Sequence, residues 1–224
     1  MGIFSIRWDY GAGLIMFFNK KKKVFCIGRN KTGTTSIEQA LKLFGYKMGD
    51  QASGELLMRD WAKRDFKKII KLCKTADAFQ DAPFSYDFTF QAMDEAFPES
   101  KFILTTRSSG EEWFESVIRF QTKIIAKNRL PTVQDLKEFP YRYKGWLWEN
   151  SQRVYGINEE TLYDKNIYIN HYNKHNDRVL EYFRNRPNDL LVLNISDSSA
   201  MEKLCDFLGI KFTGQTMPHL NQSK

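Results

Sequence analysis

The sequence predicts an α/β fold in three layers: a parallel β-sheet between two layers of helices, with a helical, aromatic-rich lobe inserted. Short, continuous apolar runs recur, as in strands that are buried on both faces. They alternate with segments of helical periodicity, as right-handed β-α-β connections require. The chain has 224 residues, of which 42% are hydrophobic. This composition supplies a core and excludes a wholly disordered chain.

The first predicted unit is a strand, a loop and a helix. Residues 24–27 read V-F-C-I, an apolar run suited to a buried strand. Residues 28–33 form a loop, and residues 34–44 repeat apolar side chains on one helical face. Gly45 then favours the end of the helix.

Strands and helices continue to alternate along the rest of the chain. Apolar runs bounded by turn residues predict the strands, and 3.6-residue periodicity predicts the helices. Pro131, Pro140 and Gly145 interrupt an aromatic-rich stretch, which indicates a helical or irregular lobe outside the sheet. The expected elements are a charged helical stretch at 54–72, a strand at 76–80, a short helix at 90–97, a strand at 101–106, a helix from 111 onward, the lobe at 128–160, a helix at 171–183, a strand at 190–195 and a helix at 199–208.

The whole chain, residues 1–224, is expected to form one domain. Residues 24–126 would form its ligand-binding core, residues 127–188 the helical lobe, and residues 189–224 the last strand, helix and tail. Residues 1–19 alternate weakly and are interpreted as an extra strand or hairpin. Their apolar run is shorter than the about 20 residues that a spanning helix needs, so we expect a cytoplasmic protein without a membrane span.

Charge and cysteine content narrow the function classes. Lysine and arginine total 34 and aspartate and glutamate 27, a net charge of +7. This favours an anionic partner, although a solvated lysine-rich surface is the simpler explanation. The three cysteines are far apart and lack C-x-x-C spacing, which excludes a disulfide scaffold. A structural metal site is not expected.

The loop after the first strand is typical of an anion-binding site. It reads G-R-N-K-T-G-T-T-S and is similar to the P-loop pattern G-x-x-x-x-G-K-[ST], which makes the predicted sheet P-loop-type. Thr34 stands where that pattern has Lys, and Lys31 lies earlier in the loop. Backbone N–H groups and hydroxyls at a helix start can hold an anion, but the displaced Lys disfavours ATP hydrolysis. The alternative is an ordinary helix cap.

Two motifs together resemble the sulfotransferases that use 3′-phosphoadenosine 5′-phosphosulfate (PAPS). The first, R-N-K-T-G-T-T-S at residues 29–36, is similar to the family form [R/P]-x-[K/R]-[ST]-G-[ST]-[ST]-[ST]. The second, K-F-I-L-T-T-R-S-S-G-E-E-W-F-E-S at residues 101–116, is a strand followed by Arg and a helix that carries Ser. The segments D-A-P-F and Y-N-K-H-N further resemble a P-loop sulfotransferase subgroup of bacteria and lower eukaryotes. The resemblance covers residues 24–125 well and residues 170–221 loosely.

The resemblance implies a PAPS-binding core at residues 24–126 and the product 3′,5′-ADP (PAP). No metal is expected, because the three histidines, His171, His175 and His219, have no convincing set of partner ligands. Lys31 to Ser36 would hold the 5′-phosphosulfate, and Arg107 and Ser116 the 3′-phosphate. The usual Arg-to-Ser spacing is eight, whereas here it is nine, which an extra residue beside Gly110 would accommodate. The predicted cofactor-binding residues are Arg29, Asn30, Lys31, Thr32, Gly33, Thr34, Thr35, Ser36, Arg107 and Ser116.

Sulfuryl transfer needs a base for the acceptor and a positive charge beside the leaving oxygen. Lys31 suits the second role. Asp81 is the first candidate for the base, because it ends the second strand just before Pro83, where relatives carry a catalytic His. His175 is the second candidate. The alternatives are that Asp81 caps a turn and that His175 is structural.

Two other functions stay open from the sequence alone: a P-loop nucleotide or small-molecule kinase, and a basic nucleic-acid-binding protein. No recognised nucleic-acid module supports the second, so no nucleic-acid partner is expected. The acceptor would be a small molecule or a glycan. The aromatic lobe, which includes Trp146 and Trp148, would either pack as core or line the acceptor pocket. The oligomeric state is not predicted.

Overall fold

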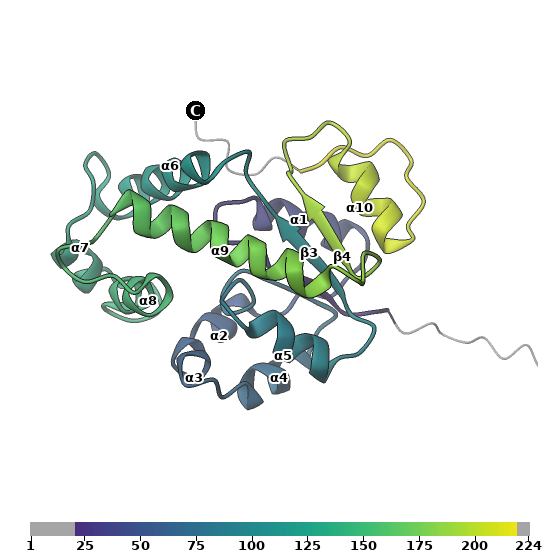
Figure 1. Cartoon of the computed structure of the whole chain (residues 1–224), viewed down its shortest axis with the longest axis horizontal. Helices are drawn as coiled ribbons and strands as arrows, with labels where there is room; N and C mark the ends of the chain where they lie inside the picture. Colours follow the sequence, from purple (N-terminus) through teal and green to yellow (C-terminus); the bar gives the residue numbers. More distant parts are fainter. Residues whose placement is uncertain (1–20, 219–224) are drawn as a thin grey trace, which may run out of the picture.

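The computed structural model describes residues 21–218, which contain a four-stranded, fully parallel sheet (Figure 1). Its strands are β1 (Val24–Cys26), β2 (Ala78–Gln80), β3 (Lys101–Thr105) and β4 (Leu190–Leu193), in the order β2-β1-β3-β4. The predicted α/β class and parallel sheet are confirmed. The strand or hairpin expected within residues 1–19 lies outside the described residues.

The sheet separates two apolar cores, because successive side chains of a strand point to opposite faces. Phe25 packs on one face with Phe79 and Phe102, whereas Cys26 packs on the other face with Ile103. The second face is covered by α1 (Thr34–Leu43) and α10 (Ala200–Leu208). The first is covered by α3 (Met58–Ala62), α4 (Lys67–Cys73), α5 (Thr89–Ala96) and the end of α9 (Lys165–Phe183). The three layers are therefore confirmed.

The lobe has a core of its own. It consists of α6 (Gly110–Gln121), the π-helical segment η1 (Thr122–Ala126), α7 (Val133–Glu138), α8 (Trp146–Tyr155) and the first half of α9. Trp113 of α6 stacks on Tyr172 of α9 with ring centroids 4.8 Å apart. Figure 1 shows α9 running from α7 and α8 to the strands β3 and β4. The helix therefore belongs to both the lobe and the helical layer on the sheet.

Two helical predictions differ from the structure in their boundaries. The stretch expected to be helical over 54–72 is divided into α2 (Gln51–Glu55), α3 and α4, with Arg64 at a φ of 59° after α3. Helix α9 begins at Lys165 rather than His171, because the Asp164 carboxylate accepts hydrogen bonds from the N–H groups of the first turn. The other expected helices and strands agree within a few residues.

The aromatic side chains of the lobe are mainly core. Trp146 is 4% exposed and packs in the core on the sheet, and Trp148 is 8% exposed and packs in the core of the lobe. The three cysteines are also buried and unpaired. Burial raises the pKa of Cys26 and Cys73 to about 12. Among the helices of residues 21–218, none is both long and apolar enough to cross a membrane.

Candidate functional site

The loop between β1 and α1 packs closely against β3 and against the segment that follows β4. A Cβ on Gly28 would lie 2.1 Å from Oγ1 of Thr105, on the adjacent strand β3. Gly33 has a φ of 105°, and a Cβ there would lie 2.4 Å from Cδ1 of Ile195, which follows β4. Both positions therefore require glycine, the second for its backbone conformation as well.

Several polar groups of this loop have no partner within the described chain. Gly33 is the N-cap of α1, so no side chain caps the helix, and its first turn holds no acidic residue. The N–H groups of Lys31, Gly33, Thr34 and Thr35 donate no hydrogen bond within residues 21–218. The Ser36 hydroxyl is buried without a partner. Open donors at a helix start, with a lysine in the same loop, form an anion-binding cradle.

Thr32 has a different role in the loop. Its hydroxyl donates to the carbonyl of Arg29 at 2.6 Å and lies 2.6 Å from Oγ1 of Thr105. The neighbouring Asn30 carbonyl accepts from Nε1 of Trp113 at 2.8 Å. These contacts tie the loop to β3 and to α6, so the cradle is held from both sides.

Lys31 is the cation of the cradle. Its backbone has a φ of 66°, and its Nζ lies 3.6 Å from the centroid of the Phe120 ring on α6. Burial lowers the pKa of Lys31, and the charge of Arg107 lowers it further, whereas the charge of Asp81 opposes both. Lys31 therefore lies within electrostatic reach of the two other charged residues that the sequence singles out.

Arg107 follows β3 and lies against the loop. Its Nε donates to the Lys31 carbonyl at 2.9 Å, and its Nη1 lies 3.2 Å from Oε1 of Glu112. Its backbone N–H donates to the hydroxyl of Tyr172 at 2.9 Å. Ser116 is half-buried on α6, and no described contact joins it to Arg107.

Asp81 follows β2 directly, with a φ of 59° and its Oδ1 accepting from the N–H of Ala82 at 2.9 Å. Burial raises the pKa of Asp81 to about 6, with a contribution from the negative charge of Glu55. Lys31 and Arg142 oppose this rise. Asp81 and Lys31, from two different loops, thus interact electrostatically at the carboxyl edge of the sheet. Ligands bind at this edge in parallel α/β folds.

Glu55 is a buried neighbour of Asp81 that the sequence does not reveal. It is 3% exposed, and its carboxylate accepts from Nε of Arg142, from the Tyr141 hydroxyl at 3.4 Å and from Nε2 of Gln51 at 2.8 Å. It lies on a five-residue helix and meets a segment 87 positions away, so no local motif marks it.

Arg29 lies in a polar cluster behind the loop. Its side chain is 2% exposed, with Nη1 donating to the Ser85 carbonyl at 2.7 Å and Nη2 to Oδ1 of Asp87 at 2.6 Å. Nη2 also contacts Nε2 of His171. The guanidinium therefore fastens the loop to the protein interior, and the Arg29 side chain is separate from the open donors of residues 31–36.

His175 lies in the same cluster. It is fully buried, with Nε2 donating to the Ile27 carbonyl at 2.8 Å and Nδ1 lying 3.3 Å from Oδ1 of Asp87. Burial and the charge of Arg29 lower the pKa of His175 to about 4, whereas the contacts with Asp87 and with the Ile27 carbonyl oppose this fall. Asp87 also accepts from Nη1 of Arg178 at 2.6 Å. We call the side chains of Arg29, Asp87, His171, His175 and Arg178 the Asp87 cluster.

Other features of residues 21–218 lie apart from this site. A pocket of about 690 Å³ lies between α3 and α8, and no predicted site residue lines it. No group of three His, Cys, Asp or Glu side chains in this part of the chain is arranged to hold a metal ion. The structure thus brings together the 31–36 loop, Asp81 and Arg107, and it places His175 and the Arg29 side chain behind them.

Comparison with known proteins gives two matches. A family model described as "Sulfotransferase domain" matches residues 23–224. The crystal structure of a sulfotransferase from Alicyclobacillus acidocaldarius is similar, with a TM-score of 0.55 and 16% identity over 90% of this chain and 87% of that chain. At this identity the structural likeness shows the fold alone. A search of curated proteins found no match.

Proposed function

Because the chain belongs to the sulfotransferase domain family, we propose that it moves a sulfuryl group from PAPS to a hydroxyl or amine by in-line transfer. The observation that carries the proposal is the pairing of an anion cradle with a carboxylate. The cradle holds Lys31, open N–H groups and the unpartnered Ser36 hydroxyl, and Asp81 is close enough to raise the pKa of Lys31. This pairing provides both a site for the donor and a base for the acceptor.

The residues present fit the donor. The orphaned hydroxyl of Ser36 and the N–H groups of Thr34 and Thr35 suit the oxygens of a 5′-phosphosulfate, and Lys31 adds a positive charge. Arg107, fixed against the same loop, suits the 3′-phosphate. Ser116 remains a proposed partner of that phosphate. When bound, PAPS supplies the sulfuryl group and departs as PAP.

Two side chains of this protein handle the charge and the proton. The Asp81 carboxylate accepts the proton of the acceptor hydroxyl or amine, because a pKa of about 6 leaves it ionised at pH 7 and more basic than an ordinary aspartate. Lys31 stabilises the negative charge that develops on the leaving oxygen. His175 is less suited to be the base, since its Nε2 hydrogen is donated to the Ile27 carbonyl in the interior.

Ligand-dependent melting tests the donor assignment. PAP at about 100 times its Kd should stabilise the protein by about 2.7 kcal/mol. Lys31→Ala and Arg107→Ala should each weaken PAP binding about ten-fold, because each removes a charge-assisted contact. Lys71→Ala on the exposed side of α4 is the control and should leave binding unchanged. A clear shift with Mg-ATP and none with PAP would instead favour the kinase alternative.

The cellular location and the acceptor class belong to the same proposal. A cytoplasmic location is supported by the three buried, unpaired cysteines, since disulfides are rare in that compartment. The acceptor is a small molecule or a glycan that reaches Asp81. Nucleic acid is not proposed as a partner.

A further inference from the structure

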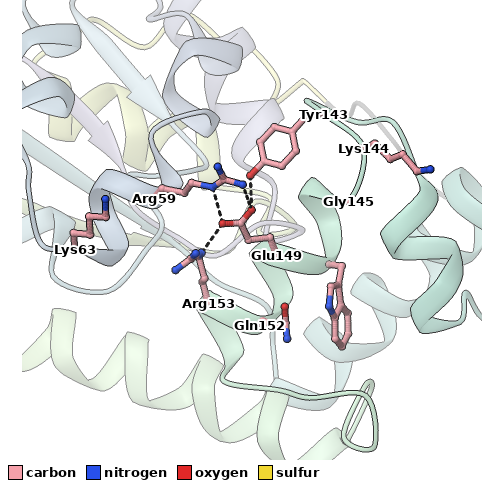
Figure 2. Close-up of a pocket in the computed structure, with 9 residues that line it drawn as sticks. Arg59, Lys63, Tyr143, Lys144, Gly145, Glu149, Gln152 and Arg153 are labelled. Atoms are coloured by element: carbon pink, nitrogen blue, oxygen red, sulfur yellow. Dashed lines mark hydrogen bonds and ion pairs between the residues drawn. The ribbon is translucent and has the colours of Figure 1, made fainter.

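The pocket between α3 and α8 is basic. It has a volume of about 690 Å³, and Figure 2 shows Arg59, Lys63 and Arg153 gathered on one side of Glu149, with Lys144 on the other. Three of these cations, Arg59, Lys63 and Arg153, lie around one carboxylate of the lining, whereas Lys144 pairs with Glu138 at 2.5 Å. The lining residues are Arg59, Lys63, Tyr143, Lys144, Gly145, Trp148, Glu149, Gln152 and Arg153.

Glu149 orients the two arginines and leaves part of each guanidinium open. Its carboxylate accepts from Nε of Arg59 at 2.8 Å, from Nη2 of Arg59 at 2.7 Å and from Nε of Arg153 at 2.7 Å. Nη1 of Arg59 and both terminal nitrogens of Arg153 have no hydrogen-bond acceptor within residues 21–218. In the same part of the chain, Nζ of Lys63 has no ion-pair partner. Fixed donors without acceptors suit an anion.

A short segment connects this pocket with the candidate site. Arg142 contacts Glu55, and its charge lowers the pKa of Asp81. The next two residues, Tyr143 and Lys144, line the pocket. The two places are therefore neighbours across residues 142–144.

We propose that the basic pocket binds carboxylate or sulfate groups of an acidic glycan, the acceptor of the transfer, beside the reacting hydroxyl. This inference rests on the proposed function. A glycan is favoured over an acidic peptide because no aliphatic side chain lines the pocket. The ring of Tyr143 has the Arg59 guanidinium 5.2 Å from its centroid, and the ring of Trp148 has Nζ of Lys137 at 5.6 Å. Cations thus lie over both rings, and the pocket offers charged donors and no aliphatic anchor for a peptide.

Fluorescence anisotropy with a labelled dextran sulfate oligomer tests the pocket. Lys63→Gln with Arg153→Gln should weaken its binding about ten-fold, because two charge-assisted contacts are lost. The matched control is Lys71→Gln with Arg184→Gln, which removes the same charge from exposed positions elsewhere and should bind as the native chain does. Neutral dextran of equal length should not bind.

The PAP and dextran sulfate measurements distinguish a failure of the proposed function from a failure of the pocket inference. PAP binding, measured by melting, should be equal in the native chain and in both double variants. If PAP does not bind the native chain, the proposed function fails; if PAP binds but both double variants hold dextran sulfate equally, the pocket inference fails. Poly-glutamate or a single-stranded oligonucleotide could also bind as tightly as dextran sulfate and lose affinity in the pocket double variant. That result would overturn the assignment to a glycan.

Discussion

At the scale of single residues, the proposed base Asp81 costs stability. Its pKa is raised from 3.8 to about 6, mainly by burial, so the folded protein holds a proton there more tightly than the unfolded chain does. Between pH 4 and 6, therefore, the free energy of unfolding falls as the pH rises. Above that window, the part-buried carboxylate costs at most about 3 kcal/mol.

Asp81→Asn should therefore separate stability from activity. The amide keeps an oxygen for the N–H of Ala82 and removes the part-buried charge. We expect a higher melting temperature at pH 8, unchanged PAP binding and a loss of turnover of at least about 100-fold. Native kcat/KM should rise with pH through about 6. Full sulfuryl transfer by the variant would show that Asp81 is not the base.

At the scale of secondary-structure elements, helix α9 determines how the loop is held. His175 of α9 donates to the carbonyl of Ile27, just before the loop, and Asp87 joins His175 to Arg29, within the loop. Burial opposes the ionisation of Asp87, but the contact with His175 and the charge of Arg29 hold its pKa well below its usual range. The Asp87 cluster thus links α9, the segment after β2 and the cradle.

Removing the charge of Asp87 should loosen this link. Asp87→Asn leaves the Arg29 guanidinium buried without a counter-ion, which should lower the free energy of unfolding by about 3–5 kcal/mol. Arg178→Gln is a matched control, because this partner is 44% exposed and its loss should cost less than about 1 kcal/mol. Urea unfolding measures both. Equal losses of unfolding free energy in the two variants would show that the burial of Arg29 does not determine the cost of removing the Asp87 charge.

Sequence reasoning succeeds for the elements in which one physical signal dominates. The strands V-F-C-I and K-F-I-L-T-T are predicted because both of their faces are buried, and the loop because its glycines and hydroxyls are contiguous. Glu55 and Asp87 are missed, because each acquires its role from partners far along the chain. The division of residues 54–72 is missed because α2, α3 and α4 are short and stabilised by tertiary packing.

At the scale of the whole molecule, strand order explains where the site lies. From β1 the chain passes to β2 on one side, and then returns to β3 on the other. Because β3 then leads to β4 on the far side, the loops after β1 and β3 lead in opposite directions. Ligands bind at such a switch point in parallel α/β sheets. Lys31 follows the first of these strands and Arg107 the second, and Arg107 donates to the Lys31 carbonyl.

Hydrogen exchange should map the proposed donor site. PAP should slow the exchange of the N–H groups of Lys31, Gly33, Thr34 and Thr35, which are open in the structure. It should also slow exchange in the segment that begins at Arg107. Residues 133–138 of α7 should exchange at the same rate with and without PAP. Protection confined to the basic pocket of α3 and α8 would contradict the assignment of the donor to the loop.

The burial of all three cysteines makes the thiols a built-in reporter of folding. Burial raises the pKa of each, and only the thiolate reacts with a disulfide reagent. The folded protein should therefore react slowly with Ellman's reagent and the urea-unfolded chain rapidly, releasing one chromophore for each cysteine. A cysteine introduced at exposed Lys63 could then be labelled selectively with a fluorophore. The native chain thus needs no prior removal of its own cysteines for a dye to be placed beside the basic pocket.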